Sequence, residues 1–274
     1  MTRFDKFRYD GKRALVVGGA TGMGAATAEL ALDAGAEVVV MDFAEVKLSG
    51  VKSIRLDLAD KASIDRAVDE CGGPVHALFA CAGVADGTPG IERINFIGHR
   101  HLIERSIARG MLGRGSAIGF ISSAAGLAWR ASLAQLVEFL DIADFDAAAR
   151  WAREHEKAHY MWTKQAICAY VAREAMSLLK RGIRINAVCP GPTDTPLAQA
   201  NKEMWLGFGA DYRAAVGVDA ATALEQAYPL VFLCSDAASA INGTTVISDA
   251  GYLSSGITES FPAATPVAKF FLAT

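Results

Sequence analysis

The sequence predicts one α/β domain over residues 1–274, a doubly wound parallel sheet covered by helices on both faces. Short, almost wholly apolar segments recur along the chain, such as 13–18 and 75–80. Such segments are typical of strands that are buried on both faces of a sheet. Segments with helical periodicity separate them, and no linker, repeat or low-complexity tract interrupts the alternation.

The order of these elements follows from the apolar runs and from the residues that cap helices. Strands are expected at 13–18, 36–42, 52–57, 75–80, 116–123, 183–190 and 244–251. Helices are expected at 22–35, 61–71, 91–112, 160–181 and 222–235. Gly35 suits the end of the first helix, because glycine adopts the backbone conformation that closes a helix without strain.

Composition excludes several classes of protein. The formal net charge is −3 and no long basic run occurs, so we expect no nucleic-acid partner. No apolar stretch reaches the roughly 18 residues of a membrane helix, and the charged N-terminus does not resemble a signal peptide. The cysteines form no C-x-x-C pair, which favours reduced thiols in a cytoplasmic protein; they are Cys71, Cys81, Cys168, Cys189 and Cys234.

A glycine-rich segment, Val17–Gly24, follows the first expected strand and opens the first helix. Gly18, Gly22 and Gly24 allow a tight turn and let the backbone approach a pyrophosphate at the helix N-terminus. A glycine-rich turn alone is a weak signal, but strand, loop and helix occur in the order that dinucleotide binding requires.

Asp42 ends the second expected strand, 18 residues after Gly24. A carboxylate there can accept hydrogen bonds from both ribose hydroxyls of NAD and would repel the 2′-phosphate of NADP. Phe43 follows it, and Ala20 and Thr21 in the glycine loop are neutral. Since no arginine or lysine is evident for that phosphate, we expect NAD as the cofactor.

Motifs spread over nearly the whole chain resemble the short-chain dehydrogenase/reductase family. They are the glycine loop, the pair Asp57-Leu58, Ala80-Cys81-Ala82-Gly83 in place of N-N-A-G, Asn95, Ser123 in "ISSAAG", Tyr160-x-x-x-Lys164, and Pro190-Gly191 with the loop after it. The resemblance implies a Rossmann-type fold and a cofactor site formed by Gly18, Thr21, Gly22, Met23, Gly24, Asp42, Phe43, Asp57, Leu58, Cys81, Ala82, Gly83, Tyr160, Lys164, Pro190, Gly191, Thr193 and Thr195.

The resemblance also implies a catalytic set of Asn95, Ser123, Tyr160 and Lys164. Tyr160 is expected to exchange a proton with the substrate oxygen while hydride moves between carbon and the nicotinamide. Lys164 lies one helical turn away. Its charge, with that of the nicotinamide, is expected to lower the pKa of Tyr160 and favour the phenolate. Ser123 would hydrogen-bond the substrate oxygen, and Asn95 would anchor a proton-relaying water.

Two departures from the family pattern stand out. Both asparagines of N-N-A-G are missing, which removes hydrogen bonds expected to brace the central sheet. In addition, 37 positions separate Ser123 from Tyr160, so residues 124–159 are expected to form a helical insertion of two short helices, the second capped by Asp144. A similar insertion and the spelling "CAG" resemble the bacterial 3α-hydroxysteroid dehydrogenase/carbonyl reductase branch, where the extra helices are associated with dimer contacts.

A competing motif overlaps the tyrosine. His155-Glu156-Lys157-Ala158-His159 fits H-E-x-x-H, the zinc signature of metalloproteases. A zinc protease needs a third ligand and an open coordination position, and no downstream pattern supplies that ligand clearly. We therefore expect no metal site, and interpret both histidines as residues of a solvated helix face, with a place at the substrate rim open for His159.

The segment 197–217 is expected to form the substrate loop. Its apolar and aromatic residues, among them Met204, Trp205, Leu206, Phe208 and Tyr212, suit a hydrophobic alcohol or ketone, although they equally suit a packed lid. The tail 254–274 carries aromatics that suit a cover over the cleft or over a partner subunit, and a frayed terminus is the alternative. A homodimer or homotetramer is expected. Alternatives are an aryl-alcohol or acyl-type reductase, a non-catalytic NAD-binding regulator, and a metal-dependent hydrolase.

Overall fold

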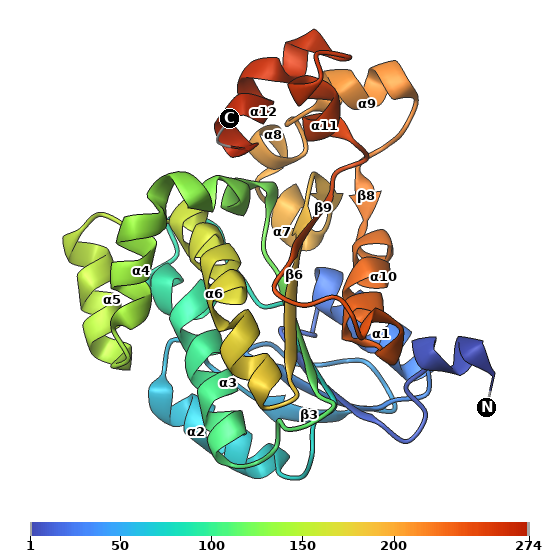
Figure 1. The fold of residues 1–274 in the computed structure, drawn as a ribbon, viewed down its shortest axis with the longest axis vertical. Coiled ribbons are helices and arrows are strands. Elements are labelled where there is room, and N and C mark those ends of the chain that lie inside the picture. The colour runs from blue at the N-terminus through green and yellow to red at the C-terminus, as the bar shows by residue number, and fades with distance from the viewer. Residues whose placement is uncertain (1, 273–274) are drawn as a thin grey trace.

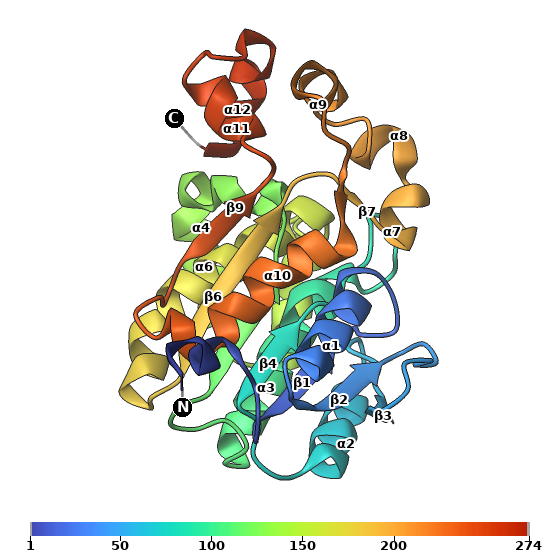
Figure 2. The same ribbon diagram turned by 90° about the vertical axis from the view of Figure 1, so that its right-hand side faces the viewer.

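The computed structural model describes residues 2–272. Its centre is a parallel sheet of seven strands in the order β3-β2-β1-β4-β5-β6-β9 (Figures 1 and 2). The strands are β1 (Arg13–Val17), β2 (Glu37–Asp42), β3 (Lys52–Arg55), β4 (Ala77–Ala80), β5 (Ala117–Ile121), β6 (Arg184–Pro190) and β9 (Thr245–Ser248). Strands β7 (Thr193–Asp194) and β8 (Ala221–Thr222) pair separately. The predicted doubly wound, Rossmann-type sheet is confirmed.

Helices cover both faces of this sheet. On one face lie α2 (Lys61–Cys71), α3 (Gly98–Ala108) and α6 (Tyr160–Lys180), with a π-helical turn η2 (Arg93–Ile97) leading into α3 (Figure 1). On the other face α1 (Gly22–Asp33) packs against α10 (Ala223–Cys234) (Figure 2). The short 3₁₀ turns η1 (Arg3–Phe7) and η4 (Asp236–Ala238) contact each other at the N-terminal side.

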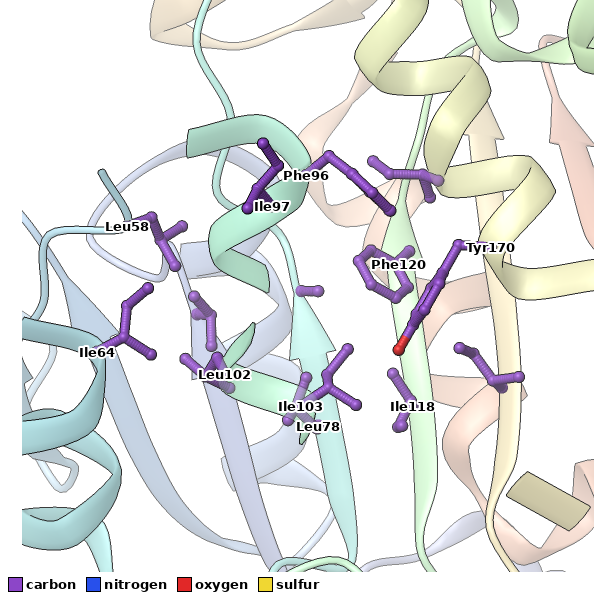
Figure 3. Packing of buried hydrophobic residues seen from close by; sticks show 14 of the residues in the cluster. Leu58, Ile64, Leu78, Phe96, Ile97, Leu102, Ile103, Ile118, Phe120 and Tyr170 are labelled. Atoms are coloured by element: carbon purple, nitrogen blue, oxygen red, sulfur yellow. The ribbon is translucent and has the colours of Figure 1, made fainter. Parts of the chain in front are cut away.

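Alternation along the strands divides the interior into two cores. Leu15 and Val17 of β1 belong to the core beneath α2, α3 and α6, whereas Ala14 and Val16 belong to the core beneath α1 and α10. This is the period of two that a strand buried on both faces requires. Figure 3 shows the first core, where Phe120 is fully buried and packs edge-on against Tyr170. Truncating such a phenylalanine to alanine typically costs about 3–5 kcal/mol.

The segment between Ser123 and Tyr160 is helical, as predicted. It comprises η3 (Ala124–Ser132), α4 (Leu133–Asp141) and α5 (Phe145–Glu154), the last capped by the Asp144 side chain. Two predicted helix ends were wrong. The helix expected over 91–112 ends at Ala108, and the second insertion helix ends at Glu154, because Glu156 adopts a left-handed φ of +56°.

The upper part of the molecule is helical (Figures 1 and 2). The predicted substrate loop contains α7 (Pro196–Gln199), α8 (Lys202–Trp205) and α9 (Ala210–Val216). The tail contains α11 (Tyr252–Ile257), η5 (Pro262–Ala264) and α12 (Thr265–Leu272). The tail therefore forms an ordered layer over its own chain. Its last two residues lie outside the described range.

Candidate active site

The glycine loop joins β1 to α1 at the carboxyl edge of the sheet, where β1 and β4 lie side by side. Gly18 has a φ of +85°, and a Cβ there would lie 2.4 Å from the Cα of Ala82. A Cβ at Gly24 would lie 1.9 Å from the carbonyl oxygen of Gly18. The loop therefore needs bare backbone at the start of α1, where amide groups and the helix dipole favour a phosphate. The residues present fit a dinucleotide.

Asp42 lies beside this loop, and two backbone amides fix its carboxylate. Oδ2 accepts a hydrogen bond from the Ala20 amide at 2.8 Å, and Oδ1 accepts one from the Ala44 amide at 2.8 Å. The expectation that no basic residue lies nearby was wrong. In the sheet Arg55 pairs with Asp42, and its guanidinium lies 4.2 Å from the ring centroid of Phe43.

Two further segments complete the cradle that the sequence motifs indicate. Asp57 follows β3 and accepts a hydrogen bond from the Ala59 amide at 2.8 Å, and Leu58 is buried. After β4, Gly83 lies close to η2 and α6, since a Cβ there would lie 3.5 Å from Asn95 Oδ1 and from Lys164 Nζ. Of the remaining residues predicted at this edge, Thr21 is exposed. The others are half-buried: Met23, Cys81 and Ala82.

The loop after β6 lies opposite the glycine loop. A Cβ at Gly22 would lie 3.6 Å from Thr195 Cγ2, so the two loops approach each other across the cleft. The Thr195 side chain caps α7 by accepting a hydrogen bond from the Ala198 amide, and Thr193 donates to the carbonyl of Gly191 at 3.0 Å. Pro190 ends β6 in the sheet. These contacts hold the loop in its turn above the strand ends.

Tyr160, Lys164 and Ser123 meet at the same edge of the sheet. Tyr160 begins α6, and the Lys164 ammonium lies 5.4 Å from its ring centroid and donates a hydrogen bond to the carbonyl of Ile121 at 3.0 Å. Ser123 follows β5, and its side chain lies close enough to the phenol of Tyr160 to lower the pKa of that group. The structure thus brings together three groups from β5 and α6 that lie far apart in sequence.

In the protein alone, the pKa of Tyr160 lies above the ordinary value of a phenol. Burial raises the pKa of this phenol to about 12, although a hydrogen bond from Ser123 opposes the rise. Burial also lowers the pKa of Lys164 to about 8. The protein alone therefore favours the neutral phenol, because loss of water around the ring outweighs the effect of Ser123. Additional positive charge is needed for the phenolate.

Asn95 joins the loop after β4 to the start of α6. Its Oδ1 accepts a hydrogen bond from the Val84 amide at 2.8 Å. Its Nδ2 donates to the Val84 carbonyl at 3.0 Å and to Thr163 Oγ1 at 3.3 Å. Both the oxygen and the nitrogen of the Asn95 side chain are thus hydrogen-bonded to the protein itself. A water at this position would have to bind another atom, such as a backbone carbonyl oxygen.

Asp86 also belongs to the site, although no sequence motif predicted it. This exposed carboxylate accepts a hydrogen bond from the backbone amide of Tyr160 at 2.6 Å, and its negative charge adds to the rise in the tyrosine pKa. It therefore holds the first turn of α6, at the favourable positive end of the helix dipole. Its place three residues after Gly83 offers no recognisable sequence signal, since the contact spans 74 positions.

The H-E-x-x-H segment does not form the helix face that the sequence suggested. His155 lies just beyond α5, where its ring stacks on Trp151 at 4.2 Å between centroids. His159 precedes α6 and caps it by accepting a hydrogen bond from the Trp162 amide at 3.3 Å. Because the helical conformation is interrupted between the two histidines, the one-turn spacing of a zinc signature is lost.

The predicted substrate loop divides into two parts. Trp205 in α8 packs against Tyr160, with 5.0 Å between the two ring centroids. Phe208 instead packs edge-on against Phe271 of the tail, at 5.8 Å. Met204 is 76% exposed. Trp205 is therefore a predicted rim residue whose ring packs against that of Tyr160.

Two features that would indicate another class of site are absent from the described residues, 2–272. No helix among them has both the length and the apolar character needed to cross a membrane. Nor do histidine, cysteine, aspartate and glutamate side chains gather there in a group of three that can hold a metal ion.

Comparisons with known proteins agree with this geometry. Residues 12–135 match the family model described as short chain dehydrogenase, and residues 141–253 match the model described as Enoyl-(Acyl carrier protein) reductase. A coniferyl-alcohol dehydrogenase of a Pseudomonas species is 27% identical over 89% of this chain and 97% of its own length. The cis-4-hydroxycyclohexanecarboxylate dehydrogenase of Sinomonas cyclohexanicum is 30% identical, over 87% and 95%.

One solved structure extends the likeness to the fold and the predicted branch. The 3-alpha-hydroxysteroid dehydrogenase of a Pseudomonas species, complexed with NADH, has a TM-score of 0.72 and 26% identity. The match covers 91% of this chain and 99% of that one.

Proposed function

This chain belongs to the short-chain dehydrogenase/reductase family, and we propose that it is an NAD-dependent dehydrogenase. The relatives named above are oxidoreductases that act on alcohols and ketones. Its substrate is a hydrophobic secondary alcohol or the corresponding ketone, alicyclic, steroid-like or aromatic. The meeting of Ser123, Tyr160 and Lys164 beside a glycine loop that excludes side chains carries this proposal.

The proposed cofactor is NAD. It would lie along the glycine loop, with Asp42 at the adenosine ribose and the loop after β6 near the nicotinamide. When bound in its oxidised form it supplies a hydride acceptor and a positive ring charge. Asp42 supports the choice, since a carboxylate repels a 2′-phosphate. Arg55 beside Phe43 favours NADP as the second candidate.

The side chains of the site divide the proton chemistry among them. Ser123 donates a hydrogen bond to the substrate oxygen, and Tyr160 Oη takes the hydroxyl proton in oxidation or returns it in reduction. Lys164 places a positive charge beside the tyrosine ring, held by the Ile121 carbonyl. Asp86 holds the start of α6 through the Tyr160 amide, and Asn95 holds the loop after β4 through the Val84 amide.

The substrate class follows from the walls of the site. Trp205 presents an indole beside Tyr160, so a flat or cyclic hydrocarbon next to the reacting carbon gains apolar contact there. Two relatives carry names that refer to a cyclohexane carboxylate and to coniferyl alcohol. We infer that the substrate is a cyclic secondary alcohol. An aryl alcohol is the alternative, because its ring could also pack against the Trp205 indole.

The test is NADH formation from NAD with cyclohexanols, hydroxysteroids and aryl alcohols, with sugar polyols as the contrasting class. The proposal expects turnover of a hydrophobic alcohol and its loss, by about a thousandfold or more, in Tyr160→Phe. Activity confined to sugar polyols contradicts the substrate class. NAD binding without turnover of any alcohol favours a non-catalytic regulator.

We further propose a cytoplasmic homodimer or homotetramer. The outer face of α10 leaves Leu224, Tyr228 and Phe232 between 36% and 52% exposed, one helical turn apart, and Phe7 stacks on Phe232 to extend this apolar strip. Such a strip is typical of a contact between subunits.

The cytoplasmic location is supported by the cysteines, since five free cysteines suit a reducing compartment.

A further inference from the structure

The carboxyl end of β4 is held by a histidine to which the sequence analysis gave no role. His99 lies on α3, one turn after Asn95, and its Nε2 is 3.0 Å from the carbonyl oxygen of Ala82. A carbonyl only accepts hydrogen bonds, so Nε2 carries the proton and donates. Burial lowers the pKa of His99 to about 4, and the imidazole is therefore neutral around pH 7.

Packing fixes the orientation of this ring. His99 is 1% exposed and packs edge-on against Phe120 of β5, with 5.9 Å between ring centroids. Its Nδ1 is buried and has no hydrogen-bond partner among residues 2–272. A buried acceptor left unpaired costs free energy, so apolar packing alone does not explain a histidine here. Within the part of the chain that the structure describes, the ring makes one hydrogen bond, to the carbonyl of Ala82.

Ala82 transmits this support to the glycine loop. Its backbone lies directly against Gly18, where a Cβ would come within 2.4 Å of the Ala82 Cα and nitrogen. The amides of Cys81 and Ala82 both donate to the carbonyl of Val17 at 2.9 Å. A shift of the Ala82 peptide would therefore move the floor of the cradle that Gly18 forms for the dinucleotide.

The resemblance to the family implies that asparagines normally brace this part of the sheet, at positions occupied here by Ala80 and Cys81. We propose that His99 takes over this bracing from the opposite helix, as a positioning residue that keeps Ala82 and Gly18 in the geometry that binds the dinucleotide. This proposal rests on the proposed function. It assigns His99 no contact with substrate.

A matched pair of variants separates the hydrogen bond from the packing of the ring. His99→Phe keeps an aromatic ring against Phe120 and loses the donor, whereas His99→Gln loses the ring and keeps an N–H of similar reach. NADH and NADPH are titrated against each folded variant by cofactor fluorescence. Hydrogen exchange of the amides at 81–83 is measured in the cofactor-free protein.

We expect His99→Phe to weaken binding of the preferred dinucleotide by about tenfold and to speed exchange of these amides, while His99→Gln stays close to wild type. Wild-type affinity and exchange in His99→Phe, or weaker binding in His99→Gln than in His99→Phe, overturn the proposal. His99→Leu replaces the phenylalanine variant if that variant does not fold. If neither donor-free variant folds, His99 serves the fold rather than the cofactor, and the proposal is wrong.

Failure of the proposed function has a different signature. In that case wild-type protein binds neither NADH nor NADPH, whatever residue occupies position 99. The hydrogen-exchange comparison still reports whether His99 holds the end of β4. The two ideas are thus tested separately.

Discussion

Replacing Asp42 with asparagine tests the choice of cofactor, because it removes a charge and keeps the shape. The Asp42 carboxylate is half-buried and held by the amides of Ala20 and Ala44, so it cannot readily swing away from a 2′-phosphate. For a charge of about −2 at about 5 Å and an effective dielectric constant of about 60, the repulsion is about 2 kcal/mol. Asp42→Asn should therefore tighten NADPH binding by roughly thirtyfold.

The assay is calorimetric or fluorescence titration of NADH and NADPH at one ionic strength, since salt screens exposed charges. Glu45→Gln is the matched control, because it removes an exposed negative charge three residues away. Arg55→Ala in the Asp42→Asn background shows whether the arginine contributes to the gain. Tighter binding of NADPH than of NADH by the wild-type protein, or no change in NADPH affinity in Asp42→Asn, refutes the electrostatic reasoning.

Three further predictions concern packing, pH and assembly. Gly24→Ala should abolish dinucleotide binding and lower the free energy of unfolding, because its Cβ would lie 1.9 Å from a carbonyl oxygen; Gly113→Ala, in open space, is the control in titration and denaturation. The His99 pKa falls from 6.5 to about 4 on folding. The neutral imidazole therefore contributes about 3 kcal/mol to the free energy of unfolding above pH 6.5, and this contribution is lost as pH falls through 4. Urea denaturation of His99→Phe should lack this pH-dependent loss of stability. Tyr228→Glu should yield monomers by light scattering, and a wild-type monomer at all concentrations contradicts the proposed assembly.

Most of the fold was predictable because its signals are local. The strands buried on both faces need continuous apolar runs, and each such run in the sequence corresponds to a strand of the sheet. Asp144 and Gly35 mark helix boundaries through their own capping chemistry. The left-handed turn at Glu156 was not predictable, since glutamate carries no preference for that conformation.

The site was predictable where motifs carry it, and less so where partners come from distant segments. Tyr160, Lys164 and Ser123 were expected together because the family pattern orders them. Arg55 escaped notice because its relation to Asp42 depends on the register of β2 and β3. The rise in the Tyr160 pKa in the protein alone was not predictable, because burial is a property of the folded chain rather than of the Y-x-x-x-K spacing.

Transfer of a labelled hydride tests the central claim most directly. A cyclohexanol deuterated at the carbinol carbon is incubated with NAD and the protein, and the reduced cofactor is analysed by mass spectrometry. The account predicts deuterium in the NADH formed by wild type and a loss of about a thousandfold in its rate of appearance with Tyr160→Phe. Deuterium transfer at an unchanged rate in that variant would contradict the role of Tyr160, and NADH formed without deuterium would contradict direct hydride transfer.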